Sequence, residues 1–209
     1  TYTVPFSNET NEENIVISTK SDTKSSKKDL INQAFKFHLN GNIKKAAEYY
    51  QDFINKGFND SRVFSNLGNI LRTIGKLNDA EKYLHKSISL RPDNAEAYNN
   101  LGLILRDLRK FEEAERSLRQ AIKIKPDFVE AHYNLGSLLG ELRKSQEAER
   151  SLRQAIKIKP NFAQAHACLG MTLLNEGKID LSLKSFSKSA ELLRGRNAPE
   201  SHNRKFSTI

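Results

Sequence analysis

The chain has 209 residues, 28% of them charged, and a formal net charge of +9 at pH 7. The length allows one or two domains, and the single cysteine excludes both a disulfide within the chain and a cysteine-rich zinc cluster. No long apolar run and no charged-then-apolar leader marks a membrane span or a signal peptide, so we expect a cytoplasmic protein.

The first 26 residues are polar and rich in Ser, Thr, Asn and charged side chains, without apolar periodicity. This pattern predicts a disordered or loosely docked segment, because its one apolar stretch, residues 15–17, is too short to offset the entropy lost on ordering. The chain begins at Thr1 rather than at a methionine, and we interpret it as a processed piece of a longer protein.

A repeat of 34 residues starts after this segment. The stretch EAERSLRQAIKIKP occurs at 113–126 and again, unchanged, at 147–160. Prolines recur at 92, 126 and 160, and a leucine–glycine pair recurs with the same period, with its glycines at 68, 102, 136 and 170. These markers predict five repeats, at 27–60, 61–94, 95–128, 129–162 and 163–196, followed by a polar tail at 197–209. A period of this length is typical of arrays of helix pairs.

Within this frame the repeats resemble the tetratricopeptide family, whose pattern is an aromatic residue, a leucine–glycine pair, and then small and apolar residues up to a final proline. The third repeat matches this pattern with Tyr98, Leu101, Gly102, Leu105, Ala114, Leu118, Ala121 and Pro126. The resemblance covers residues 27–196. It implies an all-α fold, an α-solenoid in which antiparallel helix pairs form a right-handed superhelix.

The two end repeats depart from the pattern. The first has Gln33 and Ala34 in place of the leucine–glycine pair. In the fifth, Ser182 and Ser189 replace alanines, and Arg194 replaces the proline. Because terminal repeats are atypical, we expect these serines to face water at the end of the array.

Two local features predict helix ends and helix contacts. Asp93, Asp127 and Asn161 each precede an acidic or amide side chain by three residues, which predicts that they cap the first helices of the last three repeats. The recurring glycines lie inside helices, where glycine costs about 1 kcal/mol relative to alanine. We therefore predict that they allow the second helix of each pair to approach closely.

The sequence shows no catalytic or metal-binding constellation. His132 and His166 are 34 residues apart, so their spacing follows the repeat and predicts packing rather than metal ligation. Cys168 is expected to pack as a small hydrophobe. We predict no enzyme activity, no cofactor and no metal site.

In the family that the sequence resembles, the first helices line a concave groove. The sixth residue is an asparagine in four repeats, Asn32, Asn66, Asn100 and Asn134. This resembles the asparagine ladder of the array in O-linked N-acetylglucosamine transferase, where amides hold the backbone of an extended peptide by donating and accepting hydrogen bonds. The residues predicted to line the groove are Asn66, Asn69, Arg72, Asn100, Leu103, Arg106, Tyr133 and Asn134.

The second helices carry charges that predict a solvated outer face. Glu112 with Arg116, and Glu115 with Arg119, are four residues apart and ordered for mutual support on a helix. Positive charge is in excess in all five repeats rather than gathered on one element, which argues against a dedicated nucleic-acid surface.

We therefore predict a non-enzymatic protein-interaction scaffold that binds a protein or an extended peptide in its groove. One alternative is the substrate-recognition array of a larger transferase whose catalytic domain lies outside this chain. Another alternative is a basic array that contacts nucleic acid. Self-association through the ends of the array is left open.

Overall fold

The computed structural model describes residues 26–197, which form ten helices and no strand. The first helices of the five pairs are α1 (Lys27–Leu39), α3 (Ser61–Thr73), α5 (Ala95–Asp107), α7 (Val129–Glu141) and α9 (Ala163–Asn175). The second helices are α2 (Ile43–Asn55), α4 (Leu77–Leu90), α6 (Phe111–Ile124), α8 (Ser145–Ile158) and α10 (Ile179–Asn197). The predictions for residues 1–25 and 198–209 lie outside the described residues.

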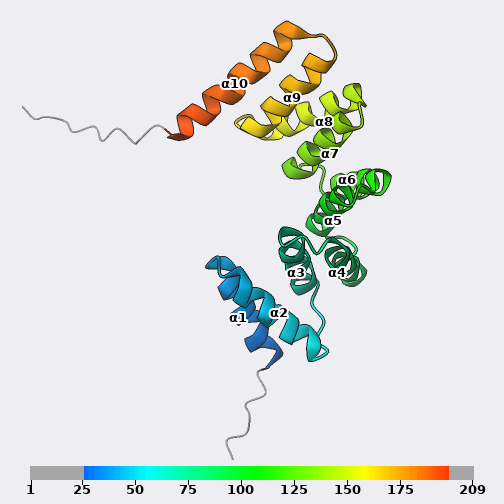
Figure 1. Cartoon of the computed structure of the whole chain (residues 1–209), viewed down its shortest axis with the longest axis vertical. Helices are drawn as coiled ribbons and strands as arrows, with labels where there is room; N and C mark the ends of the chain where they lie inside the picture. Colours follow the sequence, from blue (N-terminus) through cyan, green and yellow to red (C-terminus); the bar gives the residue numbers. More distant parts are fainter. Residues whose placement is uncertain (1–25, 198–209) are drawn as a thin grey trace, which may run out of the picture.

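The helix pairs stack one on the next into a curved array (Figure 1). In this view α3, α5 and α7 lie on the inner side of the curve, and α4, α6 and α8 lie on the outer side. Each first helix packs mainly on its own partner and on the second helix of the preceding pair. The all-α solenoid predicted from the sequence is confirmed.

Glycine occupies the point where the two helices of a pair touch. A Cβ atom at Gly136 would lie 2.6 Å from Cγ of Leu152, and one at Gly102 would lie 2.7 Å from Cγ of Leu118. Carbon atoms that are not bonded do not approach this closely, so a Cβ at either position would have to displace the facing leucine. The same position is taken by Gly68 against Leu84 and by Gly170 against Phe186. The first pair has Ala34 at the equivalent position, so this glycine contact belongs to the last four pairs. The predicted role of these glycines in close helix approach is confirmed.

An apolar core runs without a break through the central pairs. Leu101, Leu105, Leu118, Leu135 and Leu139 belong to one cluster, and none of them is more than 3% exposed. This cluster reaches from α4 to α8, so the central helix pairs share a single core. The first pair belongs to a different cluster and packs less extensively on the second pair than later pairs pack on one another.

The serines of the fifth pair are buried, and the prediction that they face water is wrong. Ser182 and Ser189 are 1% and 6% exposed. Their hydroxyl groups donate to the carbonyl oxygens of Gly170 (2.8 Å) and Ala163 (2.9 Å), and a buried hydroxyl with such a partner is tolerated. Serine is only one atom larger than alanine, so this substitution does not by itself report exposure.

The prolines mark the ends of helices as predicted. Pro92, Pro126 and Pro160 each stand two residues after the end of α4, α6 and α8. Arg194 takes the equivalent place in the fifth repeat, and there the helix continues, so that α10 reaches Asn197 and is 19 residues long. The missing proline therefore lengthens the last helix.

The predicted helix caps are displaced by one residue. The cap of α5 is Asn94 rather than Asp93, and its side chain accepts from the Ala97 amide at 3.2 Å. Phe128 and Phe162 stand at the equivalent place before α7 and α9 and give no side-chain cap. Asp127 and Asn161 are therefore not caps, and the predicted capping position was wrong by one residue. An acidic or amide side chain three residues later does not by itself determine at which residue the helix begins.

Two alanine substitutions in α7 test the glycine contact. Gly136→Ala is expected to lower the free energy of unfolding by about 1 to 3 kcal/mol, because the new Cβ must displace Leu152. Gly140→Ala is the matched control, since the nearest atom to its Cβ would be Oγ1 of Thr172 at 3.8 Å. It should raise the free energy of unfolding by up to about 1 kcal/mol through helix propensity. Urea unfolding of both variants checks this, and equal midpoints would contradict the contact.

Candidate functional site

The eight predicted groove residues come from α3, α5 and α7, the helices on the inner side of the array (Figure 1). Asn69, Asn100, Leu103 and Arg106 are half-buried, so each presents part of its side chain to solvent. The structure therefore brings these residues onto neighbouring helices of one face. Their surroundings differ from one repeat to the next.

Charged side chains of the inner face pair between repeats. The Arg72 Nε donates to Oδ2 of Asp107 at 2.7 Å, which joins α3 to α5. The Arg106 Nη1 lies 3.7 Å from Oε1 of Glu141, which joins α5 to α7. Arg106 also lies 3.9 Å from Asp107, so four alternating charges cross three helices. The inner face is therefore polar, with its charges balanced.

The three asparagines proposed as a ladder have different partners. The Asn66 Nδ2 donates to the hydroxyl of Tyr50 at 3.0 Å. Asn134 is 9% exposed, and its Nδ2 donates to Oδ1 of Asn99 at 2.8 Å. Asn100 is half-buried, and no hydrogen bond of its amide is found within residues 26–197. The three amides are not equivalent in the free array, and peptide contact by them stays a prediction.

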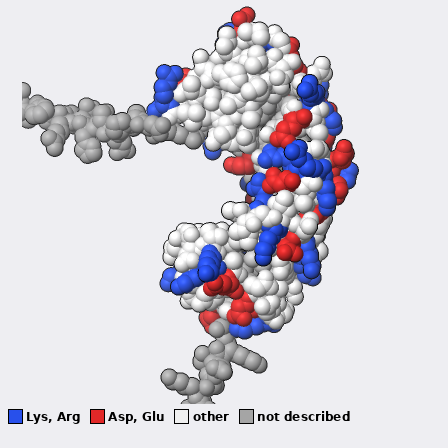
Figure 2. Space-filling view, in the orientation of Figure 1, with Lys and Arg blue, Asp and Glu red and all other residues white. Residues whose placement is uncertain are grey.

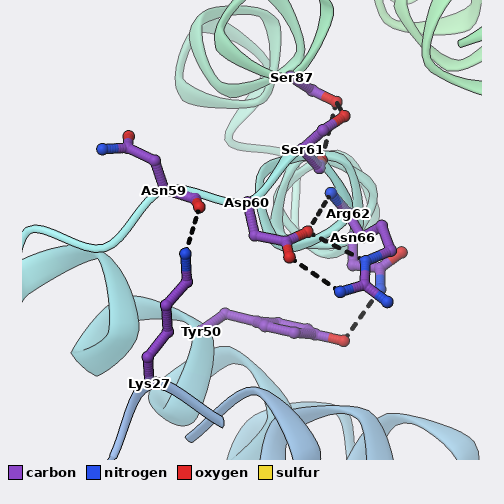
Figure 3. Close-up of polar contacts among 8 residues, drawn as sticks. All are labelled: Lys27, Tyr50, Asn59, Asp60, Ser61, Arg62, Asn66 and Ser87. Carbon is purple, nitrogen blue, oxygen red and sulfur yellow. Dashed lines mark hydrogen bonds and ion pairs between the residues drawn. The ribbon is translucent and has the colours of Figure 1, made fainter. Parts of the chain in front are cut away.

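A polar junction joins the first helix pair to the second (Figure 3). Tyr50 is fully buried on α2, and its hydroxyl accepts from Asn66 and lies 3.0 Å from Nδ1 of His38. Burial raises the pKa of the Tyr50 phenol above its ordinary value. Lys27 donates to the Asn59 carbonyl oxygen at 3.2 Å, which ties the start of α1 to the segment before α3. This junction combines directional hydrogen bonds with an apolar cluster that includes Val63 and Leu67 of α3.

The outer helices are joined by lysine–glutamate pairs with a constant spacing of 29 residues. The pairs are Lys110 with Glu81 (2.8 Å), Lys144 with Glu115 (2.8 Å) and Lys178 with Glu149 (2.9 Å). The outer side of the array accordingly carries interspersed positive and negative side chains (Figure 2).

Two of these glutamates, Glu115 and Glu149, are shared with arginines one helical turn away, whereas Glu81 lies 3.9 Å from His85. Glu115 also lies 2.8 Å from Arg119, so the predicted pair of these residues is confirmed. Lys144, and then Arg119, hold the pKa of the Glu115 carboxyl below its ordinary value, against the effect of burial. The predicted pair of Glu112 with Arg116 is not found among the ion pairs of the described residues, so this part of the prediction was wrong.

Sequence reasoning missed the partners of the inner-face residues, namely Tyr50, Asn99, Asp107 and Glu141. A signal for most of them was present in the spacing. Arg72 with Asp107, Asn99 with Asn134, and Tyr133 with Cys168 are each 35 residues apart, which is one repeat plus one residue. A residue of one first helix therefore contacts a residue of the next first helix that lies one place beyond its own equivalent position.

Two hollows lie on the inner side. One of about 490 Å³ lies between the first two pairs, where Phe35 and Arg62 form part of its wall and Leu39 is 87% exposed. The other, of about 290 Å³, lies between α7 and α9 and is lined by Ser137 and by Met171, which is 53% exposed. Both hollows place an exposed apolar side chain beside polar groups.

The described residues also bear on metals and membranes. Among them, no group of three or more His, Cys, Asp or Glu side chains is placed to hold a metal ion. None of the described helices combines the length and the hydropathy that crossing a membrane requires.

Family models of the tetratricopeptide repeat match residues 60–127 and, for a second model, residues 100–161 and 133–201. With the helix pairs described above, these matches show that the chain belongs to the tetratricopeptide repeat family. A search of curated proteins finds no match.

Among solved structures, the chain is similar to a crystal structure of MamA with 26% identity and a TM-score of 0.70, covering 78% of this chain and 95% of that one. A second MamA crystal structure has 25% identity and the same TM-score, and covers 81% of this chain and 93% of that one. MamA of Desulfovibrio magneticus RS-1 has 20% identity and a TM-score of 0.73, covering 82% and 97%, and supports the fold alone.

Acid should weaken the outer ion pairs. Because the pKa of Glu115 is lowered in the folded state, its pairs stabilise the fold above the ordinary value of about 4.5, and this contribution is lost as the pH falls below it. Glu115→Gln should lower the melting temperature by about 1 to 3 °C at pH 7, and this difference should shrink as the pH is lowered through the folded-state pKa of Glu115. Glu112→Gln is the control, and an equal loss for both variants at pH 7 would contradict the role of the pairs.

Proposed function

We propose that the chain is a non-enzymatic scaffold that binds an extended polypeptide segment along the inner face of its first helices. Membership of the tetratricopeptide family and the similarity to MamA support a role in protein interaction. The finer proposal is carried by Asn100, a half-buried amide at the centre of the inner face whose hydrogen-bonding groups have no partner within the described chain.

An amide in this position suits a peptide backbone. It can donate to a carbonyl oxygen and accept from an N–H group without reading the side chains of the ligand. Leu103 and Arg106 follow on the same helix, three and six residues later, and add apolar contact and a guanidinium group. Asn69, a half-buried amide on α3 one repeat before Leu103, extends the polar lining to the neighbouring repeat.

The two inner hollows set the length of the ligand. Neighbouring first helices are about 10 Å apart, and an extended peptide advances about 3.3 Å per residue, so each repeat spans about three residues. The hollow beside Leu39 and the hollow beside Met171 are separated by three such steps. We therefore propose a ligand with two apolar side chains about nine residues apart.

The arginines of the inner face already form ion pairs, which reduces their attraction for a charged ligand. Arg72 and Arg106 each face a carboxylate, so a ligand gains little from adding negative charge. Binding along this face should accordingly depend only weakly on salt concentration. As part of this proposal we place the scaffold in the cytoplasm, where its one cysteine, Cys168, stays reduced.

Replacing inner-face amides tests the proposal. Peptides selected from a random display library against the whole chain serve as probes. Asn69→Ala combined with Asn100→Ala should weaken their binding by about 1 to 3 kcal/mol, or about 5-fold to 150-fold in Kd, because unpaired peptide groups are left behind. Melting should change little, since no hydrogen bond within residues 26–197 is lost from either side chain.

The control is Arg116→Ala, which removes an exposed outer side chain that forms no ion pair within the described chain. It should leave affinity unchanged in a fluorescence anisotropy titration. Equal affinity of all three proteins for every selected peptide, or failure to select any peptide, would contradict binding on the inner face.

A further inference from the structure

Two grooves open between neighbouring outer helices, on the side opposite to the proposed peptide site. One of about 390 Å³ lies between α6 and α8, and residues of α7 contribute to its wall. The other, of about 450 Å³, lies between α8 and α10, and residues of α9 contribute to its wall. No aspartate or glutamate lines either groove.

The two grooves are built from the same positions of successive repeats. Lys123 and Arg150 stand on the walls of the first groove, and Lys157 and Lys184 stand 34 residues later on the walls of the second. All four side chains are exposed, and none takes part in an ion pair within residues 26–197. Each groove therefore offers two cations whose charge the described part of the chain does not neutralise.

The other basic side chains of the walls are already paired. Arg153 lies 2.7 Å from Glu149, and Lys188 lies 2.8 Å from Glu191. Arg119 of the first groove is held by Glu115 and Glu147. The unpaired excess is thus confined to two positions on opposite walls of each groove.

Apolar side chains line the deeper part of each groove. Ile122 and Leu135 do so in the first, and Ile156, Leu169 and Leu173 do so in the second. Leu169 and Leu173 are at most 4% exposed, so the floor of the second groove consists of well-packed core side chains.

A histidine fixes the wall of each groove. The Nε2 of His132 lies 2.8 Å from the Pro126 carbonyl oxygen, and that of His166 lies 2.9 Å from the Pro160 carbonyl oxygen. A carbonyl oxygen only accepts, so this nitrogen is the donor and is not free to bind a ligand. Besides packing as predicted, each histidine therefore donates a hydrogen bond to the loop that precedes its helix.

We propose that the two outer grooves bind an acidic amphipathic segment of another protein. Its carboxylates would pair with the four free cations, and its apolar side chains would enter between the helices. The proposal goes beyond the inner-face function, because it uses different surfaces of the array and a ligand of different chemistry.

The apolar lining and the charge together select this ligand. Single-stranded nucleic acid is held by stacking of its bases on aromatic faces as well as by cations, and no Phe, Tyr or Trp lines either groove. The grooves repeat with the helix pairs, about 10 Å apart. A helix rises about 1.5 Å per residue, so two apolar side chains seven residues apart would reach both grooves at once.

The probe is a labelled helical peptide of about 18 residues, with two leucines seven residues apart and four flanking glutamates. It is titrated into the whole chain and followed by fluorescence anisotropy at low and at physiological salt. Binding should weaken several-fold as salt is raised, because the cations are exposed. Replacing the glutamates by glutamine, or the leucines by serine, should each weaken binding about tenfold. An unchanged affinity for either altered peptide would overturn the proposal.

Charge reversal locates the site. Lys157→Glu with Lys184→Glu should weaken binding at least about tenfold. Lys36→Glu with Lys44→Glu makes the same change of net charge at exposed residues of α1 and α2, and should weaken it less than about twofold. Equal losses in the two variants would show attraction to net charge alone and would overturn the proposal.

Two further measurements distinguish peptide binding in the outer grooves from binding on the inner face and from nucleic-acid binding. The Asn69→Ala, Asn100→Ala variant should bind the acidic peptide like the unmodified chain, so the inner-face proposal can fail while this one stands. A single-stranded DNA of about 20 nucleotides should compete poorly with the peptide. If the DNA displaces the peptide at equal concentration, the grooves are a nucleic-acid surface and the proposal is overturned.

Discussion

The close contact of paired helices at the recurring glycines is the constraint on which the rest of the structure depends. A Cβ at Gly136 would lie 2.6 Å from Leu152, so in the four pairs that carry this glycine the missing side chain allows the close spacing of the helices. The next pair then stacks in one register, in which Arg72 meets Asp107 on the inner side and Lys144 meets Glu115 on the outer side.

Much of the fold could be predicted from the sequence, because residues 34 apart occupy equivalent backbone positions in successive helix pairs. The glycine contacts and the helix ends at the prolines are of this kind. Partners of polar side chains could not be predicted in the same way, since they depend on what the neighbouring repeat presents. Asn66 and Asn134 occupy the same position, yet one meets the hydroxyl of Tyr50 on α2 and the other meets Asn99 on α5. Likewise, Ser189 was predicted to face water, but its hydroxyl group donates to the carbonyl oxygen of Ala163.

The two faces of the array differ in how their charge is used. On the inner face Arg72 and Arg106 are paired across repeats, so the peptide binding that we propose for this face would use amides and apolar side chains. On the outer face the lysine–glutamate pairs hold the stack together, and the cations beyond them, such as Lys157, have no partner in the described chain. Ala47 stands where later repeats have the glutamate of these pairs, so the first pair lacks this ion pair and meets the second pair through apolar contacts and hydrogen bonds such as that of Asn66 with Tyr50.

We propose that one stack of helix pairs carries two separate binding surfaces. Amide chemical-shift mapping of the isotopically labelled chain tests it most directly, with a library-selected peptide and the acidic peptide added singly and then together. We expect shifts around Asn100 on α3, α5 and α7 for the first peptide, shifts around Lys157 on α8 and α10 for the second, and both sets in the mixture. A single common set of shifted amides, or displacement of one peptide by the other, would contradict it.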